Sequence, residues 1–127
     1  MTFCLPIHIL LFSTQVFSLT EKEKRSIATH LENSLDRLLQ NRSDENYKSV
    51  FADSFEYTYC NRKYPFAKSD VYKAIGDRFR LPVDSKLKFE IEEDANGVLR
   101  FPLNHMIMIR TEKIGGRFMI TAFEGSC

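Results

Sequence analysis

The sequence lacks an excess of charge of either sign, a long hydrophobic run and a large set of cysteines. Lys and Arg total 18 and Asp and Glu total 17 in 127 residues, and both signs are interspersed along the chain. A nucleic-acid-binding protein usually carries a basic stripe, and no such stripe is visible here. The composition therefore argues against nucleic acid as a partner. With 43% apolar and 13% aromatic residues, it also argues against a disordered chain.

The most apolar segment is too short to cross a membrane. Residues 3–12 supply about half of the roughly 20 apolar residues that a spanning helix needs. No Lys, Arg, Asp or Glu precedes Glu21, and Val16 and Ser18 suit a signal peptidase that cleaves after Ser18. We therefore expect residues 1–18 to be a signal peptide and the protein to be secreted and extracellular, without a membrane span. Because no basic residue precedes the run, an N-terminal strand or buried helix of a cytosolic protein is the alternative.

Cysteine is scarce, and its distribution favours one disulfide. Cys4 lies in the expected signal peptide, which leaves Cys60 and Cys127 in the mature chain. An even number of cysteines in an exported chain predicts that they pair. Closing a loop of roughly 68 residues contributes about 4 kcal/mol in the chain-entropy model. An intermolecular bond through the terminal Cys127 is the alternative.

The sequence carries one glycosylation motif and no metal or cofactor motif. Asn41-Arg42-Ser43 is an N-glycosylation sequon at the expected end of a helix, hence on the surface, so Asn41 is a candidate glycosylation site. A metal site needs more ligands than two histidines far apart in the sequence. We therefore expect no metal and no cofactor.

Hydrophobic periodicity indicates one domain at residues 19–127, without repeats or linkers. Thr20 and Glu23 have the form of a capping box, and the apolar spacing behind them predicts a long amphipathic helix. Ser43 can cap a second helix. The expected order is helix, helix, strand, helix and antiparallel strands, at residues 21–40, after Ser43, and at 55–60, 68–79, 87–91, 98–110 and 117–124. In the long strand 98–110, Pro102 indicates an edge position or a bulge.

The run Val50-Phe51-Ala52-Asp53-Ser54-Phe55-Glu56-Tyr57, where a helix passes directly into a strand, resembles the nuclear transport factor 2 superfamily. This superfamily includes the ketosteroid isomerases, and the chain is most similar to its small, secreted, single-domain members of invertebrates. The resemblance implies an α+β domain at residues 19–127, in which a cone-shaped, curved antiparallel sheet wraps around about three N-terminal helices. It also implies an apolar pocket. It implies no activity, since this fold serves enzymes, carriers and docking domains.

Four side chains are candidates to line that pocket. On the strand 98–110, His105 shares a face with Ile109 and should point toward apolar surroundings. Tyr57 and Tyr59 could enter the same cavity, and His30 flanks the apolar stripe of the first helix. A histidine with two tyrosines can bind a polar ligand head or transfer a proton. A core histidine that is hydrogen-bonded to a neighbour is the alternative.

The opposite face of the expected sheet carries further apolar residues. The alternation predicts an outward patch of Met106, Met108, Met119 and Phe123. Such patches commonly mark interfaces, so we expect a homodimer that pairs through this sheet face. Coverage of the face by the N-terminal segment or by a loop is the alternative.

These features predict a secreted, non-catalytic domain that binds a small apolar ligand or a protein partner. No residue is predicted to be catalytic, and Asp53 is more readily a capping residue than the base of an isomerase. The alternative is a small pocket enzyme of isomerase or lyase type, in which His105 and Tyr57 or Tyr59 form the acid–base pair. An enzyme needs a perturbed ionisable group in an open cavity, whereas an interaction domain can have its pocket filled by Phe and Leu.

Overall fold

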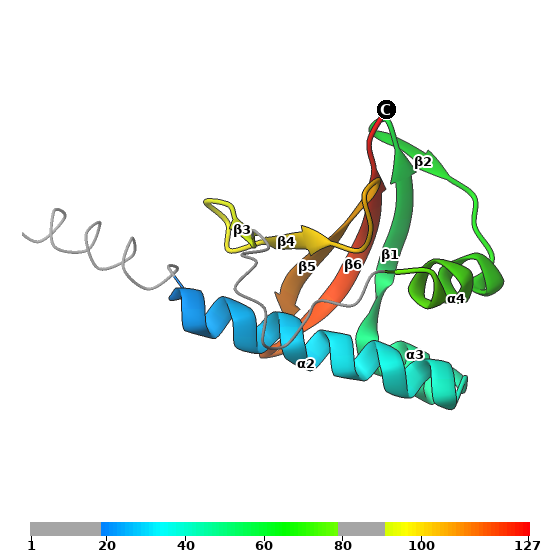
Figure 1. Cartoon of the computed structure of the whole chain (residues 1–127), viewed down its shortest axis with the longest axis horizontal. Helices are drawn as coiled ribbons and strands as arrows, with labels where there is room; N and C mark the ends of the chain where they lie inside the picture. The colour runs from blue at the N-terminus through cyan, green and yellow to red at the C-terminus, as the bar shows by residue number, and fades with distance from the viewer. Residues whose placement is uncertain (1–18, 79–90) are drawn as a thin grey trace, which may run out of the picture.

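A computed structural model describes residues 19–78 and 91–127, and these residues form an α+β domain (Figure 1). The expected signal peptide at residues 1–18, and most of the expected strand at 87–91, lie outside the described residues. The helices are α2 (Glu21–Gln40), α3 (Asp44–Val50) and α4 (Lys68–Gly76). The strands are β1 (Phe51–Tyr59), β2 (Arg62–Tyr64), β3 (Glu92–Glu93), β4 (Leu99–Pro102), β5 (Ile107–Ile114) and β6 (Arg117–Gly125).

The helix starts follow the local sequence. The Thr20 hydroxyl accepts a hydrogen bond from the Glu23 amide at 3.1 Å, and the Glu23 carboxylate accepts one from the Thr20 amide at 3.0 Å. The predicted capping box of α2 is confirmed. Ser43 caps α3 by accepting from the Asn46 amide at 3.1 Å, as its sequence position predicts. These contacts satisfy amide groups that the first turn of a helix leaves without partners.

The described strands form one open, mixed sheet in the order β2-β1-β6-β5-β4-β3. The expectation of an antiparallel sheet is wrong at one place, because β1 and β6 run parallel, with Tyr57 opposite Phe123. Parallel neighbours require a long crossover, and here α4 and the strands β3 to β5 lie between them in the sequence. Figure 1 shows α2 lying across one end of this sheet and α4 beside β1.

The single strand expected at 98–110 is two strands joined by a turn. The Asn104 side-chain oxygen accepts hydrogen bonds from the amides of Met106 and Ile107, at 2.8 and 2.9 Å. This carboxamide takes up amide groups that a continuous strand would pair with a neighbour. His105 therefore lies exposed in the β4–β5 turn, and the expectation that it points into apolar surroundings from a strand is wrong.

Aromatic side chains fill the core between the sheet and the helices. Phe51, Phe101 and Phe123 are at most 1% exposed and lie on the sheet face that the helices cover. Phe51 contacts Phe123 edge to face, with ring centroids 5.8 Å apart. The helices add buried aliphatic side chains at Ala28, Leu31, Leu35, Leu38, Val71 and Ile75. Burying one of these leucine, valine or isoleucine side chains contributes about 1.5–3 kcal/mol.

A buried ion-pair cluster holds the end of α4 against α2. The Arg78 side chain is 1% exposed and pairs with the carboxylates of Asp36 and Glu32 on α2. Its guanidinium also donates to the Ile75 carbonyl at 2.7 Å. A buried charge costs several kcal/mol unless it is paired, so this contact fixes how α4 approaches α2.

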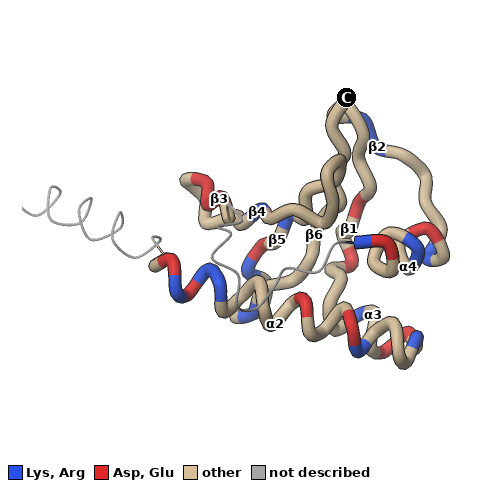
Figure 2. The backbone as a smooth tube through the Cα atoms, viewed as in Figure 1, with Lys and Arg blue, Asp and Glu red and all other residues tan. Residues whose placement is uncertain are grey.

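The outer face of the sheet carries ion pairs instead of an apolar patch. Glu124 pairs with Arg100 at 2.8 Å and with Arg110 at 3.3 Å, and Arg110 also pairs with Glu56 at 3.2 Å. These pairs link side chains from β1, β4, β5 and β6 across the face that is turned away from the helices. Figure 2 shows charges of both signs on the helices and on the sheet.

The four residues of the predicted patch do not share one surface. Phe123 belongs to the core at 0% exposed, and Met119 is 6% exposed. Met106 is 59% exposed and lies in the β4–β5 turn, while Met108 lies opposite Glu124. The patch is wrong because a register shift between Arg110 and Thr111 and the turn at Asn104 break the alternation on which it depended.

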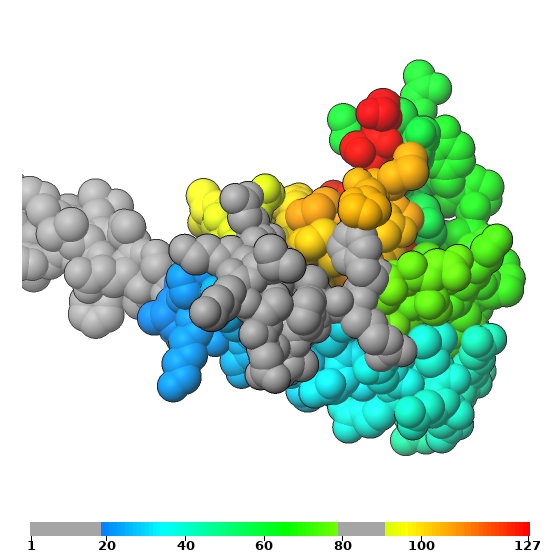
Figure 3. Space-filling view, in the orientation of Figure 1, coloured from blue at the N-terminus to red at the C-terminus, as the bar shows by residue number. Residues whose placement is uncertain are grey.

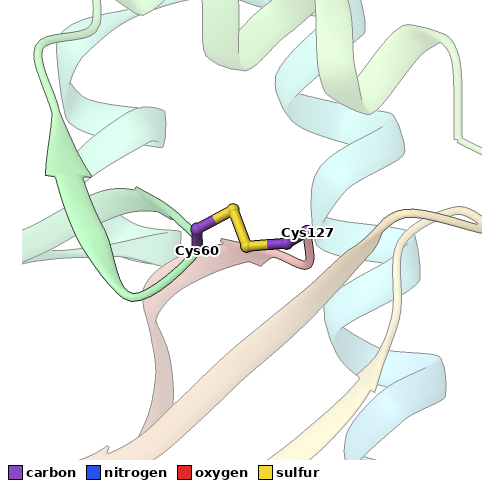
Figure 4. The surroundings of a disulfide bond; sticks show 2 residues. All are labelled: Cys60 and Cys127. Atoms are coloured by element: carbon purple, nitrogen blue, oxygen red, sulfur yellow. A yellow bond between two sulfur atoms is a disulfide. The ribbon is translucent and has the colours of Figure 1, made fainter.

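A disulfide joins Cys60 and Cys127, whose Cα atoms are 5.1 Å apart (Figure 4). Cys60 lies in the turn between β1 and β2, and Cys127 follows the end of β6. The Cys60 amide also donates to the Gly125 carbonyl at 3.2 Å. The bond therefore ties together the ends of two strands that already pair.

We expect the Cys127→Ser variant to lose about 2–5 kcal/mol of unfolding free energy, because the broken crosslink no longer restricts the unfolded chain. Chemical denaturation measures this loss. The double variant Cys60→Ser, Cys127→Ser should match the single variant, since both lack the same bond. Titration of free thiols in the denatured, unreduced secreted protein should find none. Two free thiols would contradict the disulfide.

Candidate functional site

A row of aromatic side chains on β1 leads from the core to the surface. Phe51 is 1% exposed and Phe55 8%, Tyr57 is half-buried, and Tyr59 is 40% exposed. Tyr57 contacts Phe123 edge to face at 5.8 Å between centroids. The sheet face that forms the core therefore continues beyond the helices, and its last aromatic residues face solvent.

These aromatic residues border an open groove of about 640 Å³. The groove lies between the end of β1, the segment that leads from β2 into α4, and the β4–β5 turn. In Figure 3 the orange turn residues lie close to the green residues of that segment. We call it the aromatic groove, and its lining residues are Tyr57, Tyr59, Tyr64, Pro65, Phe66, Asp70, Lys73, Ala74, Asp77, Asn104 and Ile107.

A second hollow of about 410 Å³ adjoins the aromatic groove. The two share Tyr57, Tyr59, Asn104 and Ile107, and the hollow adds His105, Met106 and Gly125. The structure therefore brings together three of the four predicted pocket residues, Tyr57, Tyr59 and His105. His105 lies in a turn and not in the expected strand.

His30, the fourth predicted residue, lies elsewhere. It is exposed on α2 and borders a separate hollow with Arg117 and Phe118. Helical spacing indicated correctly that His30 flanks the apolar stripe of α2. It could not indicate that His30 borders a different hollow from the one that Tyr57 and Tyr59 line.

A tight turn places β2 beside the aromatic row. Cys60 and Asn61 both have positive φ, 53° and 63°, which is the backbone geometry of a two-residue hairpin. Tyr64 therefore lies opposite Tyr57 in the β1–β2 ladder. The Tyr59 and Tyr64 rings are 6.1 Å apart and nearly perpendicular, at 81°.

The absence of a side chain at Gly125 leaves room for the Tyr59 ring. A Cβ atom at Gly125 would lie 2.8 Å from Cδ2 of Tyr59, which is closer than real Cβ contacts come. Gly125 pairs with Tyr59 on one side and with Ile107 on the other. The position of the Tyr59 ring therefore depends on the absence of a side chain here.

Large apolar side chains are exposed mainly around these two hollows. The exposed large hydrophobic residues of the described chain are Tyr59, Tyr64, Phe66, Met106 and Ile114. All of them except Ile114 line the aromatic groove or the adjoining hollow. Because single exposed apolar residues are common but clusters are not, this concentration makes the two hollows the candidate site.

The charged residues that line the aromatic groove belong to α4 and its C-cap. Asp70, Lys73 and Asp77 follow one another at helical spacing and line one wall. Burial raises the pKa of the Tyr57 phenol, and the negative charge of Asp70 raises the pKa further. The groove thus holds its Tyr57 hydroxyl in the neutral form over a wider pH range than usual.

The described residues give no support for a metal centre or a membrane span. Among them, no group of three His, Cys, Asp or Glu side chains lies close enough together to hold a metal ion. None of the described helices is both long and apolar enough to cross a bilayer. Asp53 is exposed on β1 and does not line the aromatic groove.

The sequon residue Asn41 lies at the surface between two helices. It is the C-cap of α2, and its amide donates to the Arg37 carbonyl at 3.0 Å. The Asn41 side chain is exposed. This position is accessible to a glycan, in agreement with the expected end of the helix.

Comparisons with known proteins give no family assignment. No protein-family model matches the sequence, and no curated protein matches it. One solved structure is similar, that of a protein of unknown function with a cystatin-like fold from Nostoc punctiforme. It shares 14% identity at a TM-score of 0.48, and the match covers 86% of this chain and 93% of that chain. A likeness this distant assigns neither a family nor a function.

Of the residues that line the aromatic groove, only Tyr57 and Tyr59 were predicted from the sequence to line a pocket. Tyr64 and Phe66 were not among the predicted pocket residues, although their exposed rings line the groove. The signal that was available is the run Tyr64-Pro65-Phe66, in which two aromatic residues flank a proline just after a strand. The acidic residues of α4 gave no signal, because a charged helix face is usually only a solvated one.

We expect Tyr57→Phe to remove a component with a raised pKa from the absorbance titration of the tyrosines. Asp70→Asn should lower the pKa of Tyr57 but leave the larger effect of burial. Since the folded state holds this proton more tightly than the unfolded chain, whose tyrosines titrate near the ordinary 10.0, Tyr57 should reduce stability as the pH rises above that value. Asp53→Asn, an exposed change outside the groove, is the control. Equal shifts in both Asp variants would contradict the electrostatic contact.

Proposed function

We propose that this protein is a non-catalytic binding domain whose site is the aromatic groove and whose ligand is a small, partly apolar molecule. One observation carries the proposal: nearly all exposed large apolar side chains of the described residues surround this groove and the adjoining hollow. Leaving such side chains in water forgoes about 25 cal/mol for each Å² that could be buried. A ligand that covers them recovers this free energy.

The size and form of the aromatic groove favour a small molecule as the ligand. Its volume of about 640 Å³ lies within the range of small-molecule sites, roughly 300–1,000 Å³. Its walls come from three different segments, which the disulfide and the Arg78 cluster hold in place. A site that is formed before the ligand arrives loses less entropy on binding.

The interior of the fold supports binding over catalysis. Phe51, Phe55 and Phe123 contact one another with centroids 4.8–5.8 Å apart and fill the space between the sheet and the helices. The ligand site is therefore at the open end of the sheet. Water reaches this end freely, whereas a general acid–base pair works best in a site that excludes water.

A pocket enzyme with a His/Tyr pair is the second candidate. It is favoured by the joint placement of His105, Tyr57 and Tyr59 around the adjoining hollow. Against it stands the exposure of His105, whose turn is held by the Asn104 carboxamide. A turnover that His105→Gln abolishes while ligand binding persists would favour the enzyme.

We also propose that the chain is secreted as a member of the nuclear transport factor 2 superfamily, with its sheet curved into a cone around the helices. The direct passage from α3 into β1 at Val50–Phe51 supports this family. The disulfide supports an oxidising compartment, since such bonds are rare in reducing ones. Homodimerisation through the sheet face is not part of the proposal, because that face carries ion pairs.

We expect the protein secreted from eukaryotic cells to begin at Leu19 and to carry a glycan at Asn41. Intact mass measured before and after glycosidase treatment reports both features. Asn41→Gln should remove the glycan mass and leave the protein folded, because the Asn41 side chain is exposed. A secreted chain that still contains Cys4 would contradict the cleavage site.

We expect the double variant Tyr59→Ala, Tyr64→Ala to bind small aromatic fragments about tenfold more weakly than the native protein, because aromatic anchors commonly contribute more than about 1 kcal/mol. Titration followed by NMR measures the affinity and maps the site. Ile114→Ala removes an exposed apolar side chain outside the groove and should change nothing. Fragment contacts that map instead to the hollow beside His30 would overturn the proposed site.

A further inference from the structure

The aromatic groove combines aromatic rings with carboxylates, and this combination defines the class of its ligand. Its rings come from β1 and from the segment after β2, and its carboxylates come from α4. The residues concerned are Tyr57, Tyr59, Tyr64, Phe66, Asp70 and Asp77. The inference rests on the proposed binding function and adds the chemistry of the ligand.

Aromatic faces attract cations. The face of a tyrosine ring carries partial negative charge, and an ammonium group within about 6 Å of its centroid is stabilised. Tyr59 and Tyr64 lie at 81° to each other with centroids 6.1 Å apart, so a compact group beside them touches both rings. Quaternary ammonium groups suit such a site because they are large, weakly hydrated and positively charged.

The charges on α4 add to this attraction. Asp70 and Asp77 face the groove with a single cation, Lys73, between them in the sequence. One Asp70 oxygen accepts from the Ala67 amide at 2.9 Å, which leaves the other oxygen as an acceptor. The effect of Asp70 on the pKa of the Tyr57 phenol indicates that its charge acts within the groove. Among the described residues that line the two hollows, His105 is the other ionisable side chain besides these charged residues and the tyrosines.

Two cationic side chains of this protein stack on aromatic rings that do not line the groove. Among the described residues, Arg42 stacks over Tyr72 at 4.7 Å and Lys68 over Tyr47 at 4.9 Å. Both contacts lie outside the aromatic groove. The contact between a cation and an aromatic face therefore already occurs in this fold, and the two contacts among the described residues lie on rings outside the groove.

We propose that the aromatic groove binds a small, free organic cation, an alkylammonium or arylammonium compound. Its charged group rests against the rings of Tyr59 and Tyr64, and the carboxylates of Asp70 and Asp77 balance the charge. Its apolar part covers Phe66 and Ile107. A free compound fits a groove of about 640 Å³, in which both ends of the ligand can be held.

The test compares two probes that differ only in charge, choline and its neutral tert-butyl isostere. NMR titration of the native protein should show choline binding about fivefold or more tightly than the isostere. Added salt should weaken the binding of choline alone, because salt screens the carboxylates. Asp77→Asn should lower the affinity for choline and leave that for the isostere unchanged. Asp53→Asn is the matched control outside the groove.

Three outcomes would overturn this proposal. Equal binding of choline and its isostere would show an apolar site without charge selection, and the proposed binding function would stand. Binding of neither probe would exclude an organic cation, while the fragment titration still decides the binding function separately. Phosphatidylcholine vesicles that retain the protein when free choline does not bind would assign the groove to a membrane surface.

Discussion

The parallel pairing of β1 with β6 places the aromatic side chains of β1 against Phe123, and the rest of the described architecture depends on this contact. Parallel neighbours cannot be joined by a tight turn, so α4 and the strands β3 to β5 lie between them in the sequence. The disulfide and the hydrogen bond between the Cys60 amide and Gly125 close the same end of the pair. The pairing of these two distant segments thus determines which aromatic rings form the core and where the core ends.

The candidate site lies where the aromatic row of β1 leaves the core and reaches the surface. The helices cover the sheet near Phe51, but the aromatic row continues to Tyr59, which is 40% exposed. A globular domain gains nothing in stability from keeping several large rings in water. Their concentration at one end, next to the carboxylates of α4, is the observation on which the proposed ligand binding rests. On the outer face, by contrast, ion pairs link side chains across several strands.

Much of the fold was predictable, because its signals are local. The capping residues Thr20 and Ser43 and the spacing of apolar residues fixed the bounds of α2 and the start of α3. The last strand was placed to within one residue of its end at Gly125. The strand expected at 98–110 failed because Asn104 satisfies two amides through its own side chain. Leu103 and Ile109 are buried on either side of that turn, so the apolar pattern around it resembled one continuous strand.

By itself, the sequence determined the three helices and their capping residues, the last strand, and the expectation that Cys60 and Cys127 pair. Each of these depends on residues that are close in sequence or on simple counting. Only the tertiary structure decided that β1 and β6 run parallel, that His30 lies apart from Tyr57, and that α4 brings its carboxylates to the aromatic row. Those arrangements depend on packing between segments that are far apart in the chain, and no local pattern records them.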